Sequence, residues 1–241
     1  MNVKKVFDKT DFIFSDFDGT ITKYDVIHSF IAQFAKGDTK TAEDKWSKGE
    51  ISTKECLNIQ IGKITELKKS AFDDFINSIE IDPYFIDFYK IAKSKNKKII
   101  ILSDGFDYFI VSTLKRYGLF DIKIFSNHLE YETENGFLKF KMTYPNGFKD
   151  CSIGSGCCKC NVALSYDKNY TYIGDGLSDR CIAKKSALLF AKKSLETFCK
   201  NEKISYFPYK TFQDITEAVF KENSDAADGV EFNNRIQNQR T

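Results

Sequence analysis

Three short apolar segments of this chain are each followed at once by glycine and polar, mostly acidic, residues. The segments cover residues 11–15, 97–102 and 170–173. Segments of this kind are typical of parallel strands that are buried on both faces. The sequences that follow them are Asp16-Phe17-Asp18-Gly19-Thr20, Ser103-Asp104-Gly105 and Gly174-Asp175-Gly176-Leu177-Ser178-Asp179. Because the carboxyl ends of parallel strands share one edge of an open sheet, we expect these residues to line one ligand-binding crevice.

The composition of this predicted edge favours a metal ion. Carboxylate oxygens are the donors that Mg²⁺ prefers in proteins, and three strands would deliver several of them to one place. The sequence therefore predicts an α/β fold with a Rossmann-like parallel-sheet core and a Mg²⁺ site at the carboxyl edge of the sheet. The residues that would form this site are Asp16, Asp18, Ser103, Asp175 and Asp179.

Only helical patterns lie between the first and second predicted strands. Apolar positions recur at helical spacing over residues 24–35, 40–46 and about 66–79, and Ser52 to Glu55 has the capping-box pattern that begins another helix. We interpret residues 24–79 as a small all-helical cap inserted after the first acidic sequence. Such a cap would close over a ligand and exclude water.

The remainder of the chain, residues 1–23 and 80–221, forms the predicted α/β core. Within it, residues 123–126 indicate another strand, and an Asn-Gly pair predicts the turn of a β-hairpin over about 127–144, beside the sheet. Residues 222–241 have few apolar side chains and many Asn, Asp and Gln, so we expect a disordered tail.

The charge of the chain is nearly balanced, with 36 Lys and Arg against 34 Asp and Glu and a formal net charge of +2. The lysines are dispersed, so we expect no nucleic-acid partner. We find no apolar segment of membrane-spanning length and no secretory signal at the N-terminus. We therefore expect no membrane partner and a cytoplasmic location.

A lysine between the second and third acidic sequences completes a family resemblance. With Lys159 in Cys157-Cys158-Lys159-Cys160, the chain is similar to the four ordered motifs of the haloacid dehalogenase superfamily of phosphatases. This resemblance implies hydrolysis of a small phosphorylated metabolite with Mg²⁺ as cofactor. Asp16 would be the nucleophile that forms an aspartyl-phosphate. Asp18 would protonate the leaving group and then activate water.

The resemblance also assigns the binding residues. Mg²⁺ would be held by Asp16, by the backbone carbonyl of Asp18 and by Asp175, with Asp179 as a further ligand or behind the ligands. The phosphoryl group would be bound by Ser103, the amide of Asp104 next to Gly105, and Lys159. In this family Ser-Gly-Gly is usual where the chain has Ser103-Asp104-Gly105, so Asp104 adds negative charge near the phosphate.

A helical cap between the first two motifs resembles the phosphoserine phosphatase branch of the superfamily. Within it, the likeness is greatest to the methionine-salvage phosphatases of 2-hydroxy-3-keto-5-methylthiopentenyl-1-phosphate, and extends to Glu50-Ile51-Ser52 and to residues 207–212. Phosphatases of phosphoserine, phosphoethanolamine or phosphocholine, and pyridoxal phosphate are the alternatives. A phosphotransferase or phosphomutase, and a non-catalytic metal-binding protein, are further hypotheses.

One acidic residue of the cap bears on the substrate. Asp25 follows Asp16 by nine residues, where phosphoserine phosphatases place the acid that binds the substrate amine. An acid in the first turn of a helix, stabilised by the helix dipole, explains Asp25 equally well.

The chain has seven cysteines, and four of them crowd one segment: Cys151, Cys157, Cys158 and Cys160. The two-residue gap between Cys157 and Cys160 is that of zinc ligands, and the other two would complete a set of four. Because Cys158 and Cys160 flank the lysine that points at phosphate, we favour buried, reduced thiols that pack as small apolar residues. Regulatory oxidation is the third interpretation. An intracellular location argues against a disulfide framework.

Overall fold

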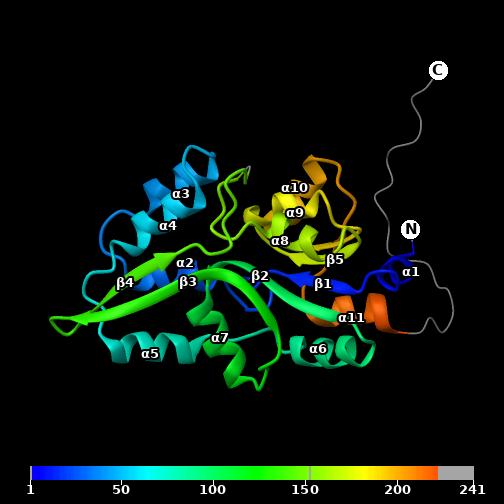
Figure 1. Ribbon diagram of the computed structural model, residues 1–241, viewed down its shortest axis with the longest axis horizontal. Helices are drawn as coiled ribbons and strands as arrows, with labels where there is room; N and C mark the ends of the chain where they lie inside the picture. The colour runs from blue at the N-terminus through cyan, green and yellow to red at the C-terminus, as the bar shows by residue number, and fades with distance from the viewer. Residues whose placement is uncertain (1, 152, 222–241) are drawn as a thin grey trace.

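A computed structural model describes residues 2–151 and 153–221 of the chain (Figure 1). The tail predicted at residues 222–241 lies outside the described residues. Within them, seven strands form one sheet in the order β4-β3-β2-β1-β5-β6-β7. Their bounds are β1 Phe12–Ser15, β2 Lys98–Phe106, β3 Lys123–Glu134, β4 Phe137–Thr143, β5 Tyr170–Gly174, β6 Leu188–Ala191 and β7 Phe207–Pro208.

The three predicted core strands lie together in the middle of this sheet. β1 pairs in parallel with β2 on one side and with β5 on the other, which places Ser15 opposite Ile101 and Ile173. All strand pairs are parallel except that of β3 with β4. The carboxyl ends of β1, β2 and β5 therefore meet at one edge, and the predicted mostly parallel α/β fold is confirmed.

Helices cover both faces of the sheet (Figure 1). Successive side chains of a strand point to opposite faces, and the packing follows this rule: Ile13 belongs to the apolar cluster on the side of α6, α7 and α11, and Phe14 to the cluster on the side of α8 and α10. The helices are α1 Val3–Phe7, α2 Val26–Phe34, α3 Lys40–Ser47, α4 Thr53–Ile61, α5 Lys69–Ser78, α6 Phe85–Ser94, α7 Asp107–Arg116, α8 Lys159–Tyr166, α9 Arg180–Ala183, α10 Lys193–Asn201 and α11 Phe212–Phe220, with the 3-10 turn η1 Leu177–Asp179.

Two strands extend further than the sequence pattern indicates. β2 continues through the second motif to Phe106, with an irregularity in its pairing with β3 between Leu102 and Phe106. β3 pairs first with β2 and then, antiparallel, with β4, so the predicted hairpin is the edge of the main sheet and not a separate unit. Its turn has Asn135 and Gly136 at φ of 52° and 81°, the left-handed geometry that favours an Asn-Gly pair.

The helices α2 to α5 occupy the segment that we interpret as a cap. The capping box at the start of α4 is present, with Ser52 and Glu55 exchanging hydrogen bonds through side chain and backbone. α3 and α4 lie on the opposite side of the sheet from α5, which lies alongside α7 (Figure 1). A separate cap domain over residues 24–79 stays a prediction.

A cluster of phenylalanine rings ties two of these helices to the core. Phe30 of α2 lies with its ring centroid 5.0 Å from that of Phe109 on α7 and 5.8 Å from that of Phe140 on β4. Phe72 and Phe75 of α5 contact Phe109 as well, with centroids 5.8 and 6.0 Å away. α2 and α5 therefore share one hydrophobic core with the sheet.

No helix among the described residues is long and apolar enough to cross a membrane.

Candidate active site

Acidic residues from two distant segments of the chain meet at the carboxyl edge of the sheet. Asp16 follows β1, Asp175 follows β5, and Asp179 ends η1. One carboxylate oxygen from each lies within 4.8 Å of the others, and all three residues are buried. Among the described residues no other group of His, Cys, Asp and Glu offers three ligand atoms this close together.

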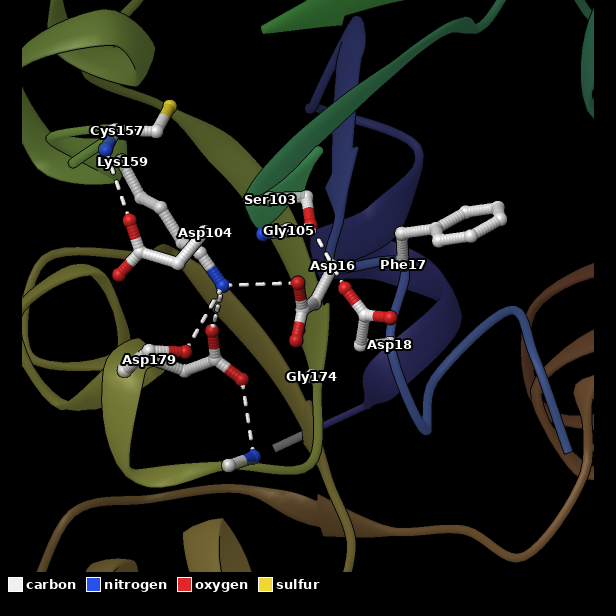
Figure 2. Close-up of polar contacts among 12 residues, drawn as sticks. Asp16, Phe17, Asp18, Ser103, Asp104, Gly105, Cys157, Lys159, Gly174 and Asp179 are labelled. Carbon is white, nitrogen blue, oxygen red and sulfur yellow. Dashed lines mark hydrogen bonds and ion pairs between the residues drawn. The ribbon is translucent and has the colours of Figure 1, made fainter. Parts of the chain in front are cut away.

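Lys159 supplies the positive charge at the centre of these acids (Figure 2). As the first residue of α8, it extends its side chain into the site, where Nζ lies 2.9 Å from Asp16 Oδ1 and 2.6 Å from Asp179 Oδ1. Burial alone would lower the pKa of Lys159, but the carboxylates of Asp16 and Asp179 raise it well above its usual value. Lys159 is therefore charged at every physiological pH.

Asp16 and Asp18 differ in their surroundings. Burial, and beyond it the charges of the neighbouring acids, raise the pKa of Asp16 well above its usual value, against the opposing effect of Lys159. Burial and then the charge of Asp25 raise the pKa of Asp18 to about 7, although a hydrogen bond from Ser103 lowers it. Near neutral pH, Asp18 can therefore carry a proton that it is able to give up, which suits a general acid and base.

The second motif orients Asp18. Ser103 Oγ donates a hydrogen bond to Asp18 Oδ2 at 3.2 Å, and the backbone N–H of Val26 donates to Oδ1 at 3.2 Å. The Gly105 N–H in turn donates to Ser103 Oγ at 2.9 Å. A Cβ atom on Gly105 would lie 2.3 Å from Asp18 Oδ2, so only glycine permits this close approach.

Asp104, the departure from the family pattern, has a structural contact of its own. Its Oδ1 accepts a hydrogen bond from the Cys157 N–H at 2.8 Å, which fastens the segment before α8 to β2 (Figure 2). Burial raises the pKa of Asp104, with Lys159 opposing the rise. The carboxylate therefore positions the start of the lysine-bearing helix, in addition to lining the site.

A cavity of about 370 Å³ opens between these acids and the helices α2 to α4. Asp25 lies on its wall and is the N-cap of α2, where its Oδ1 accepts a hydrogen bond from the His28 N–H at 2.8 Å. Asp25 therefore caps the N-terminus of α2, and it also lines the cavity. The residues of α2, α3 and α4 that line this cavity are Ile27, His28, Ile31, Glu43, Trp46, Thr53, Cys56, Leu57 and Gln60.

The cysteine-rich segment corrects one interpretation. Cys160 forms a disulfide with Cys181, which joins α8 to α9. The expectation of a reduced Cys160 is therefore wrong, and Cys160 is not free to bind zinc. The physical reason is that Cys160 follows Lys159 and Cys181 comes shortly after Asp179, so the ion pair between Lys159 and Asp179 also brings the two cysteines together.

The other three cysteines of this segment remain thiols. Cys157 and Cys158 are buried and Cys151 is partly buried. Burial raises the pKa of Cys158, and that of Cys157 by more, which keeps both thiols protonated and unreactive at neutral pH. Their packing fits the interpretation of small apolar residues.

Two residues at the site escaped the sequence analysis. Tyr172 of β5 donates its hydroxyl hydrogen to Asp179 Oδ1 at 2.6 Å. Lys193, at the start of α10, places Nζ 2.8 Å from Asp175 Oδ2. Neither residue belongs to a motif that marks it in the sequence: Tyr172 lies inside an apolar strand, and Lys193 is one of many dispersed lysines.

Comparison with known proteins identifies the family. A family model described as haloacid dehalogenase-like hydrolase matches residues 13–184, more than half of the chain. The chain belongs to this family. The fold of this hydrolase is also that of a solved substrate-bound complex of phosphoserine phosphatase, with a TM-score of 0.65 and 19% identity, covering 88% of this chain and 99% of that one.

Relatives with assigned functions are more similar in sequence. A 2-hydroxy-3-keto-5-methylthiopentenyl-1-phosphate phosphatase of Bacillus cereus is 31% identical over 209 residues, covering 84% of this hydrolase and 93% of the relative. A protein of the same name from Lysinibacillus sphaericus is 31% identical over 216 residues, covering 86% and 92%. The prediction of a phosphatase of the haloacid dehalogenase type is confirmed.

Proposed function

We propose that this hydrolase removes phosphate from a small phosphomonoester through an aspartyl-phosphate formed on Asp16. The observation that carries this proposal is the position of Asp16: its carboxylate is buried, lies beside Lys159 and has Asp18 as the next acid along the chain. Lys159 offsets the repulsion between an anionic nucleophile and an anionic substrate. The nucleophile thereby splits a slow hydrolysis into two faster displacements.

Asp18 would transfer the protons of both displacements. Held by Ser103 and by the N–H of Val26, its carboxyl group has a fixed orientation, and its pKa of about 7 lets it protonate a leaving alkoxide. The resulting carboxylate can then take a proton from the water that attacks the phosphorylated Asp16.

The residues present fit a Mg²⁺ ion. The acids of the site outnumber the two lysines that contact them, and burial raises the pKa values of both Asp16 and Asp175. Asp16, Asp175 and the backbone carbonyl of Asp18 would hold the ion. When bound, Mg²⁺ would neutralise charge on the phosphoryl group and on the nucleophile.

Asp179 is better suited to holding neighbouring site residues in position than to binding the metal ion directly. Its Oδ1 accepts hydrogen bonds from Lys159 and Tyr172, both at 2.6 Å. Its Oδ2 accepts from the backbone N–H groups of Asp175 and Gly176, both at 3.1 Å. Since both oxygens are already engaged, we assign Asp179 the role of positioning Lys159 and the Asp175 segment.

As substrate we propose 2-hydroxy-3-keto-5-methylthiopentenyl-1-phosphate, the compound in the names of the two relatives. The cavity supports an uncharged chain on the phosphate, because Ile27, Ile31, Leu57 and Trp46 form much of its wall. One observation favours a second candidate: the Asp25 carboxylate on the same wall would pair with the ammonium group of phosphoserine or phosphoethanolamine.

Phosphate release from a panel of phosphomonoesters tests both candidates. We expect the methylthiopentenyl ester to give a kcat/KM at least about tenfold above those of phosphoserine, phosphoethanolamine, phosphocholine and pyridoxal phosphate, a difference that one or two well-placed contacts supply. A preference for the amine esters would reject the proposed substrate and support the role of Asp25 in binding an amine. Absence of phosphate release from every ester would reject the proposed reaction.

The same assays with EDTA provide the control for the metal. EDTA should stop phosphate release and excess Mg²⁺ should restore it. Ca²⁺ should not, because its looser and higher coordination would misplace Asp16 for attack. Full activity with Ca²⁺ alone would contradict the proposed site.

The pKa of Asp18 predicts a pH profile. An alkyl leaving group needs the proton of Asp18, so kcat for an alkyl ester should fall about tenfold per pH unit well above the pKa of about 7. An aryl ester such as 4-nitrophenyl phosphate has a leaving group that needs no proton, so kcat for its first displacement should be flatter on the alkaline side. Steady-state assays and single-turnover assays of both esters from pH 5 to 9 measure this. Identical alkaline limbs in single turnovers would exclude Asp18 as the acid.

A further inference from the structure

A lysine of α10 lies against one of the proposed metal ligands. Lys193 Nζ lies 2.8 Å from Asp175 Oδ2 and donates a second hydrogen bond to the carbonyl oxygen of Gly19 at 3.0 Å. Lys193 and Asp175 both line the cavity that holds Asp16. The ammonium group therefore occupies the space between the loop that contains Gly19 and the loop that contains Asp175.

The surrounding backbone holds Lys193 in this place. Its φ of 51° is in the left-handed region, which is uncommon for a long side chain and persists only where the surroundings enforce it. The Asp175 carbonyl accepts hydrogen bonds from the Ser194 hydroxyl at 3.2 Å and from the Leu195 N–H at 2.9 Å. The start of α10 is thus fastened to the residue that Lys193 contacts.

Gly19 makes the contact possible. With φ of 69°, it brings its backbone so close that a Cβ atom would lie 2.4 Å from Asp175 Oδ2 and 2.8 Å from Lys193 Nζ. The absence of a side chain at Gly19 thus leaves space for a cation beside Asp175, and the ammonium group of Lys193 occupies that space.

We propose that Lys193 competes with Mg²⁺ for the Asp175 carboxylate and so lowers the Mg²⁺ affinity of the site. This inference rests on the Mg²⁺ site of the proposed function. An ammonium group and a divalent cation on one carboxylate repel each other, because they are separated by only a few ångströms. The side chain of Lys193 is half exposed, whereas that of Lys159 is buried between two acids. The ammonium group of Lys193 is therefore the one that can move away from its carboxylate when the metal binds.

The opposite role would be that Lys193 positions Asp175 for the metal. The two roles predict opposite effects of removing the charge. If Lys193 competes, Lys193→Met binds Mg²⁺ more tightly; if it positions Asp175, the same variant binds Mg²⁺ more weakly.

Isothermal titration of Mg²⁺ into chelator-treated protein separates them. We expect a dissociation constant roughly tenfold lower for Lys193→Met than for the unmodified chain, given the repulsion that is removed. Lys184→Met is the matched control: this lysine pairs with Glu202 at 2.8 Å, and its side chain is 50% exposed against 51% for Lys193. The control removes the same charge away from the cavity, and its affinity should change less than about twofold because solvent and salt screen it.

A second measurement needs no variant. Acetylation of the unmodified chain by an activated ester, read by mass spectrometry, should label Lys193 faster with saturating Mg²⁺ than with EDTA, while Lys184 is labelled equally in both. An unchanged or weaker affinity in Lys193→Met, or equal labelling of Lys193 with and without Mg²⁺, would overturn the proposal. An unmodified chain that binds no Mg²⁺ would instead overturn the metal of the proposed function.

Discussion

Replacing Asp16 by asparagine should abolish phosphate release, with a loss of about 10⁴-fold or more in kcat, as for other essential nucleophiles. An amide nitrogen or oxygen does not attack phosphorus as a carboxylate does, so no aspartyl-phosphate can form. The fold should persist, because Asp16→Asn removes one charge from a group of acids that repel one another and thereby raise the pKa of Asp16.

Phosphate release and circular dichroism of the purified variant measure the two parts of this expectation. Asp74→Asn, an identical change at an exposed position of α5, is the control and should retain full activity. Acid-quenched reactions of the unmodified chain with radiolabelled substrate should carry the label on the peptide that contains Asp16. Retained turnover in Asp16→Asn, or label on another residue, would reject Asp16 as the nucleophile.

Lys159→Met should cost both activity and stability. Removing one partner of a buried ion pair costs about 3–5 kcal/mol, because the remaining charge is buried without compensation. Here two partners lose their cation at once, since Lys159 Nζ lies 2.9 Å from Asp16 and 2.6 Å from Asp179. We therefore expect the free energy of unfolding to fall by at least this amount at pH 8.

The pH dependence of this loss follows from linkage. Burial raises the pKa of Asp16 and Lys159 opposes the rise, so without Lys159 this pKa lies still further above that of the unfolded chain. The folded variant therefore binds more protons than the unfolded one, and its stability falls as pH rises. The difference in the free energy of unfolding between the unmodified chain and Lys159→Met should therefore be larger at pH 8 than at pH 5. Urea unfolding at both pH values measures it, with Lys184→Met as the control. A pH-independent loss below about 1 kcal/mol would mean that the site does not depend on this cation.

The active-site edge could be predicted from the sequence because its residues follow from a local pattern. Asp16 and Asp175 follow β1 and β5, and Ser103 follows the apolar run of β2. Parallel strands bring their carboxyl ends together whatever else the chain does. The start of α4 was predictable for a similar reason, since Ser52 and Glu55 satisfy its first N–H groups within a single turn.

Features that depend on contacts between distant segments could not be predicted in this way. Cys160 and Cys181 are paired because a whole strand and an ion pair bring α8 and α9 together, and no spacing in the sequence encodes this. β3 joins the sheet and the hairpin because it changes partners along its length, from β2 to β4. Lys193 has the sequence context of an ordinary surface lysine, and only the docking of α10 on Asp175 gives it a partner in the site.

The phenylalanine cluster has a consequence for the motions of the molecule. α5 buries Phe72, Phe75 and Ile76, whereas α3 buries only Ala42. Segments with few buried apolar side chains open at a lower free energy than the global unfolding transition. Amide hydrogens of α3 should therefore exchange with solvent through local opening, and those of α5 only when the sheet itself unfolds. Local opening of α3, which supplies Glu43 and Trp46 to the wall of the cavity, would then widen access to the site while α2 and α5 stay packed on the core.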